Sequence, residues 1–104
     1  MELRHIPWTE PQPPGEPVLR KLLEAQGFEV TVWRDPADRV YEAHSHCEDE
    51  RLQVLRGRIV LHAGDRDFPL GPGDCLDLPR GVVHTARAGP EGAVYLIGRL
   101  RNVG

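Results

Sequence analysis

The spacing of hydrophobic residues changes from a helical period to a period of two near residue 28. Before that point, the segment 17–26 begins with a proline, is followed by a glycine and places four apolar residues on one helical face: Val18, Leu19, Leu22 and Leu23. Proline suits a first helical turn and glycine suits the position after the last, so this segment predicts one short helix. Residues 1–15 contain four prolines, and we expect them to form an irregular arm.

After residue 28, short apolar-alternating runs are separated by glycine, proline and aspartate. The predicted strands are FEVTVWR, RVYEAHSH, ERLQVLRG, RIVLHAG, DCLDLP, GVVHTAR and AVYLIGRL. Residues 64–67 are turn-like, and FPLGPGD adds further glycine and proline punctuation. Seven or eight short strands with one helix are typical of an all-β sandwich or barrel. At 104 residues the chain has room for one core, so we expect a single domain over 1–104 with its barrel core at about 28–101.

Composition and charge narrow the classes of partner. Hydrophobic residues make up 39% and charged residues 28%, as in an ordinary globular protein. We find no apolar run near the roughly 18 residues of a membrane helix and no apolar signal-peptide core, which predicts a cytoplasmic protein without a membrane partner. The formal charge is −3, with both signs spread along the chain, which argues against nucleic acid. A single asparagine and ten prolines fit a heat-adapted host, while the excess of arginine over lysine, twelve to one, fits a GC-rich genome.

Candidate chemistry begins with two histidines in the run RVYEAHSH. Alternate residues of a strand face the same side, so His44 and His46 project together, with Val40 and Glu42 beside them. Tyr41 is expected to face the other way. Two imidazoles placed like this can hold one metal ion. Glu42 could then act as an acid or base in the pocket.

Two further ligand candidates lie on other segments. After a short turn, Glu50 can enter the adjacent strand, where Leu52 and Val54 share its face and would form an apolar pocket wall. A fourth ligand must come from elsewhere in the sequence. His84 is the best candidate, because it follows a tight Pro-Arg-Gly bend that could aim its side chain inward.

These residues resemble the two sequence motifs of the cupin family. The first is matched by His44-Ser45-His46, three residues, Glu50, six residues and Gly57. The second is matched by Gly73, five residues, Pro79, one residue, Gly81, two residues and His84. Eight specified residue types at the right offsets make coincidence very unlikely, since glycine and proline are only about 7% and 5% of residues.

Two positions depart from the usual motifs. Asp38 replaces the glycine that usually opens the first, and Ala88 replaces the asparagine that usually ends the second. Neither change removes a ligand. The compact spacing from Gly57 to Gly73 is similar to that of small single-domain prokaryotic cupins, the RmlC-like jelly rolls.

The resemblance implies a jelly-roll β-barrel in which three histidines and one glutamate bind a divalent metal. Mixed nitrogen and oxygen ligands suit Mn, Fe, Co, Ni, Cu or Zn. An open coordination position would permit oxygenase, isomerase or decarboxylase chemistry on a small molecule. The alternatives are a non-catalytic module that binds or senses a small molecule, and a barrel whose histidines are structural and hold no metal. A homodimer is the expected assembly, since it would cover exposed sheet edges.

The remaining reactive residues have simpler interpretations. Cys47 should point away from His46, and Cys47 and Cys75 are expected to be reduced thiols. His5 and His62 are expected at the surface or in packing. Tyr95 could pack in the core, lie at a subunit interface or offer its phenol to a substrate.

Overall fold

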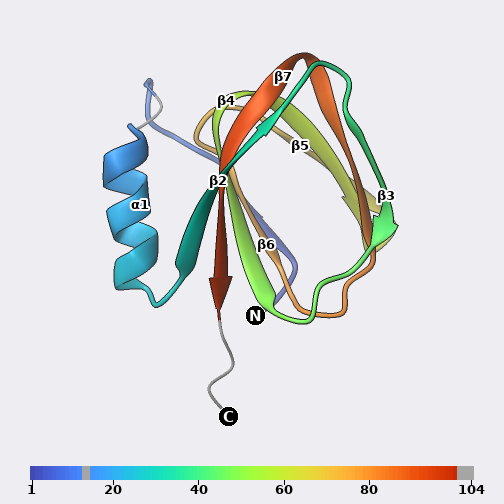
Figure 1. Cartoon of the computed structure of the whole chain (residues 1–104), viewed down its shortest axis with the longest axis horizontal. Helices are drawn as coiled ribbons and strands as arrows, with labels where there is room; N and C mark the ends of the chain where they lie inside the picture. The colour runs from blue at the N-terminus through green and yellow to red at the C-terminus, as the bar shows by residue number, and fades with distance from the viewer. Residues whose placement is uncertain (13–14, 101–104) are drawn as a thin grey trace.

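The computed structural model describes residues 1–12 and 15–100, and this part of the chain forms seven strands and one helix (Figure 1). In chain order these are β1 (Arg4–Ile6), α1 (Glu16–Ala25), β2 (Glu29–Asp35), β3 (Val40–His44), β4 (Asp49–Ala63), β5 (Arg66–Leu70), β6 (Cys75–Leu78) and β7 (His84–Leu100). The all-β prediction with one short helix is confirmed. The end of the predicted core, residue 101, lies outside the described residues.

All strand pairs are antiparallel, and two long strands organise the barrel. The main path runs β1-β6-β4-β7-β2, while β3 pairs with β7 and β5 pairs with β4. The first half of β4 contacts β6 and the second half contacts β5, so β4 serves two parts of the curled sheet. Figure 1 shows the sheet closing around an interior, with β3 on the side away from α1.

The long strands β4 and β7 were each expected as two shorter strands, and this expectation was wrong. Gly57 does not end a strand but lies at a bend, where the β4–β7 register shifts. Gly57 has a φ of 76° and Gly92 a φ of 78°, a backbone region that favours glycine. A Cβ on Gly57 would lie 2.1 Å from the Gly92 carbonyl oxygen. The glycines therefore allow two paired strands to bend together without breaking their ladder.

Two segments expected to be irregular form strands. Residues Arg4–Ile6, within the predicted arm 1–15, pair with β6 as β1. The backbone N–H of Trp8 then donates to Asp74 Oδ1 at 2.7 Å, which fixes the chain beyond β1. Residues Arg66–Leu70, expected to be turn and punctuation, pair with β4 as β5. In both cases an available strand edge outweighs the local turn propensity.

The core has two parts, and they determine where the cavity lies. One fills the barrel interior with aliphatic side chains from β4, β5 and β6, among them Leu52, Leu61 and Leu76. The other lies between α1 and the outer face of the barrel, and it includes Leu19, Leu23, Phe28, Leu55 and Leu96. Of the four apolar residues predicted on one helix face, Val18 and Leu22 remain exposed. The described residues contain no helix with the length and apolarity needed to cross a membrane.

Candidate metal centre

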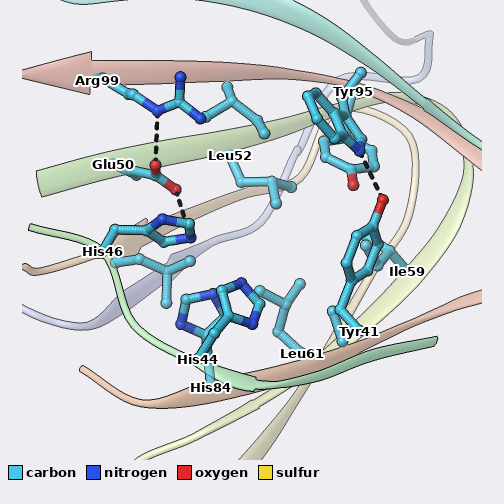
Figure 2. A pocket seen from close by; sticks show the side chains of 14 residues that line it. Tyr41, His44, His46, Glu50, Leu52, Ile59, Leu61, His84, Tyr95 and Arg99 are labelled. Atoms are coloured by element: carbon cyan, nitrogen blue, oxygen red, sulfur yellow. Dashed lines mark hydrogen bonds and ion pairs between the residues drawn. The ribbon is translucent and has the colours of Figure 1, made fainter. Parts of the chain in front are cut away.

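Three histidines from different positions along the chain meet inside one end of the barrel (Figure 2). His44 ends β3, His84 begins β7, and the two are opposite each other in the β3–β7 ladder. His46 follows two residues after His44. One ligand nitrogen from each ring lies within 4.8 Å of the others, so the three imidazoles can hold one metal ion.

Backbone carbonyls fix the orientation of two of these rings. His44 Nδ1 lies 2.7 Å from the Glu42 carbonyl oxygen, and His84 Nδ1 lies 3.1 Å from that of Val82. A carbonyl oxygen only accepts, so each Nδ1 must carry the hydrogen and donate it. The lone pair then lies on Nε2, which is the arrangement that metal-binding histidines usually have.

The surroundings of His84 favour its neutral form. Burial lowers the pKa of His84, and the neighbouring His44 and His46 lower it further, against the opposing effects of the Val82 hydrogen bond and Glu50. A histidine must be neutral to bind a metal. The buried ring is therefore in the protonation state that a ligand requires at neutral pH.

Glu50 lies beside the triad and is oriented by an arginine. It projects from β4, is only 4% exposed, and places Oε1 at 3.5 Å from His46 Nε2. Its other oxygen, Oε2, accepts a hydrogen bond of 2.9 Å from Arg99 Nε on β7. This carboxylate can thus face the histidines while its charge is balanced by Arg99.

The triad lines an open cavity of about 140 Å³. Aliphatic side chains form most of one wall, and aromatic side chains stand away from Glu50 and Arg99 (Figure 2). The lining residues are Trp33, Tyr41, His44, His46, Glu50, Leu52, Ile59, Leu61, Leu78, His84, Ala86, Tyr95, Ile97 and Arg99.

Only some of the predicted pocket residues line this cavity. Leu52 lines it, as expected, whereas Val54 is fully buried in the packed barrel core. Glu42 lies outside the cavity, in a shallow groove on the outer surface. Tyr41 borders this groove too, but it also lines the cavity, where Glu42 was expected. The expected strand alternation fails because the β3–β7 register shifts between Tyr41 and His44, which puts both side chains on the cavity side.

A hydrogen-bonded network of aromatic residues and a carboxylate stands at the far wall. Trp33 Nε1 donates to Tyr41 Oη at 2.7 Å, and the Tyr41 hydroxyl donates to Asp35. Tyr95 Oη donates to the other Asp35 oxygen at 2.6 Å. Burial raises the pKa of Tyr95, and the bond to Asp35 raises it further, so this phenol keeps its proton.

Sequence reasoning missed Asp35, Trp33 and Arg99. Asp35 directly follows the predicted strand FEVTVWR and precedes Pro36, a position whose sequence favours a turn. Tyr95, Ile97 and Arg99 alternate along β7, so their common facing could have been found from the period of two. No comparable signal connects Asp35 to Tyr95, since they are 60 positions apart.

The other reactive side chains lie away from the cavity. Cys47 is exposed, while burial raises the pKa of Cys75 to about 12, and both are free thiols. His62 is exposed and bonds Asp67 at 2.7 Å. His5 packs edge-on against Phe68.

The sequence and the fold both match known proteins. Residues 31–97 match the family model described as "Cupin domain". No curated protein matches the chain. Among solved structures, a protein of unknown function from Rhizobium leguminosarum bv. viciae 3841 shares 21% identity with a TM-score of 0.68, over 72% of this chain and 71% of that one.

Two structures with named proteins have the same fold. KdgF from Halomonas sp. shares 22% identity with a TM-score of 0.62, over 73% of this chain and 72% of that one. The DMSP lyase DddQ from Ruegeria pomeroyi DSS-3 shares 26% identity with a TM-score of 0.68, over 74% of this chain. This match spans 40% of the lyase chain.

Proposed function

This chain belongs to the cupin domain family, and from that premise we propose that it is a metal-dependent enzyme acting on a small molecule in the barrel cavity. The observation that carries the proposal is the convergence of three imidazoles on the wall of an open cavity. A metal held there would touch both the protein and any molecule that enters.

The proposed ligands are His44, His46, His84 and Glu50. Three nitrogen donors and one carboxylate suit Mn, Fe, Co, Ni, Cu or Zn. Bound in this way, such an ion would supply an open coordination position and a Lewis acid. Arg99 would hold the Glu50 carboxylate in place, in the way that residues around a metal site usually orient its ligands.

The cavity sets the size and polarity of the substrate. Its volume of about 140 Å³ is close to the roughly 150 Å³ at which an apolar protein cavity accepts benzene. A molecule of comparable size can therefore be enclosed, and a longer one would extend through the open mouth. The aliphatic wall formed by Leu52, Ile59 and Leu61 would exclude water from its central part.

The reaction classes that we propose are oxygenation, isomerisation and decarboxylation of a small molecule. The similarity to a DMSP lyase adds lyase chemistry to this set. The test is a turnover and oxygen-uptake panel of small acids, sugars and phenols, run with protein loaded separately with each metal. We expect turnover of at least one substrate by the wild type and none by His84→Ala, with His62→Ala as the control histidine variant. Turnover that is equal in the His84→Ala protein would contradict the proposal.

A second function, non-catalytic binding or sensing of a metabolite, is favoured by one feature of the cavity. Apart from the triad, its ionisable groups are already engaged: Glu50 with Arg99, and the two phenols with Asp35. Among the described lining residues no carboxylate stands free to act as a base. A metabolite that co-purifies in the cavity and is released unchanged would select this function.

We also propose a homodimer. Val40 on β3 and Val60 on β4 are 53% and 42% exposed and line one shallow outer groove, which a second copy could cover. Light scattering is expected to give twice the mass of the chain. A monomer across the working concentration range would remove this part of the proposal.

A further inference from the structure

Asp35 is a buried carboxylate beside the cavity whose charge has no cationic partner within the described residues. It is 7% exposed, and its two oxygens accept hydrogen bonds from the neutral phenols Tyr41 and Tyr95. The arginine ion pairs of the described part involve other acids. Arg39 contacts the Tyr41 ring, 4.9 Å from its centre, and forms no ion pair with Asp35 within the described residues. Burying a charge without a counter-charge is costly, and this one stands next to an open cavity.

The hydrogen bond from Tyr41 to Asp35 determines which hydrogen bonds the Tyr41 hydroxyl can form with a ligand in the cavity. A phenol has one hydrogen to donate and two lone pairs. Tyr41 donates its hydrogen to Asp35 and accepts one from Trp33 Nε1, which leaves one lone pair unused. Because its hydrogen is committed, this oxygen can only accept a hydrogen bond from a ligand. The negative charge behind it strengthens that acceptor.

We propose that Tyr41, positioned by Asp35 and Trp33, forms a subsite for the protonated amine of a small ligand. The subsite would lie at the aromatic end of the cavity, away from Glu50 and Arg99 (Figure 2). The proposal rests on the proposed function only for the other end of the ligand, which would reach the metal. The ligand class is therefore a short amino acid whose amine and carboxylate stand at opposite ends.

The chemistry of this wall distinguishes an ammonium group from its alternatives. An anionic group would be repelled by Asp35, and a methyl group would leave the Tyr41 lone pair without a donor. An ammonium group forms a charge-assisted hydrogen bond, roughly twice as strong as a neutral one. Trp33 and Tyr95 also line this end, and aromatic rings tolerate a nearby cation.

The test compares two probes of equal size, 4-aminobutanoate and pentanoate, which differ by an ammonium in place of a methyl group. Affinities are measured by titration calorimetry on metal-loaded protein, and the Trp33 indole N–H signal is followed by NMR. We expect 4-aminobutanoate to bind about tenfold more tightly and to shift the Trp33 signal. Equal affinities for the two probes would overturn the subsite.

Variants show whether Tyr41 and Asp35 are responsible. Tyr41→Phe keeps the ring and removes the acceptor, so the tenfold preference should disappear. Asp35→Asn should reduce it in the same way, whereas Asp67→Asn, an equal change of charge at an exposed residue, should leave it intact. A preference that persists in Tyr41→Phe contradicts the proposal. If Asp35→Asn does not fold, Tyr41→Phe decides alone.

A third probe separates failure of the subsite from failure of the metal site. Butylammonium has no metal-binding group, so it is titrated into metal-free protein while the Trp33 signal is followed. If the histidines bind no metal, butylammonium should still shift this signal, whereas 4-aminobutanoate and pentanoate should both bind more weakly because their carboxylates have no metal to contact. If metal binds but 4-aminobutanoate and pentanoate bind with equal affinity, the proposed subsite is contradicted and the proposed metal site is not.

Discussion

His84 is a buried imidazole whose lowered pKa makes the stability of the metal-free protein depend on pH. In the folded chain its pKa lies below the usual value of about 6.5, because burial disfavours the charged ring. As the pH falls through about 6.5, the unfolded chain takes up this proton before the folded one does. The free energy of unfolding should therefore be highest above that pH and decrease below it.

This decrease can be isolated with a matched pair of variants. Urea unfolding of metal-free protein at pH 7.5 and pH 5.5 should show a smaller loss of stability in His84→Gln than in the wild type. His62→Gln makes the same substitution at an exposed position away from the cavity and serves as the control. An identical loss in all three proteins would mean that His84 titrates normally.

Individual site residues were predictable where they lie close together in the sequence or at the spacing of a known motif. His44 and His46 are two positions apart, and the motif spacing placed Glu50 and His84 relative to them. The facing of Tyr41 was not predictable, since it depends on a register shift in β3. Asp35 gave no signal either, because its partners are distant in sequence and it precedes a proline.

At the scale of elements, the bend shared by β4 and β7 depends on the absence of a side chain at Gly57. An alanine there would place its Cβ 2.1 Å from the Gly92 carbonyl oxygen, in a backbone conformation that L-residues avoid. We expect Gly57→Ala to lower the free energy of unfolding by roughly 3 kcal/mol or more. Chemical denaturation measures this directly.

Gly81 provides the control for backbone strain alone. It has a φ of 81°, similar to that of Gly57, but a Cβ there would meet no atom within 4 Å. Gly81→Ala should therefore cost only about 1 kcal/mol. If the two variants lose the same stability, the close approach of β4 and β7 does not constrain the bend.

For most elements the sequence predicted whether they are helix or strand, but it predicted their first and last residues less well. The helix was expected at 17–26 and occupies Glu16–Ala25, because proline and glycine mark its ends. The strands β4 and β7 were each divided in two, since a glycine that bends a strand has the same sequence signature as one that ends it. β1 could not be inferred from its own sequence, because its formation depends on the edge of β6.

At the scale of the whole molecule, metal binding at the site should stabilise the folded barrel. The four proposed ligands come from β3, the loop after it, β4 and β7, so an ion bound to all four would cross-link separate strands. A ligand that binds only the folded state stabilises it by about 2.7 kcal/mol when its concentration is one hundred times its Kd. Metal addition should thus raise the unfolding temperature of the wild type.

Elemental analysis of untagged protein, purified without chelators, tests the central claim most directly. We predict about one transition-metal ion per chain in the wild type and in His62→Ala, and loss of that ion in folded His44→Ala and His84→Ala proteins. Circular dichroism would establish that the variants are folded. A metal-free wild type that does not take up any of these ions, or triad variants that keep the ion, would contradict the account.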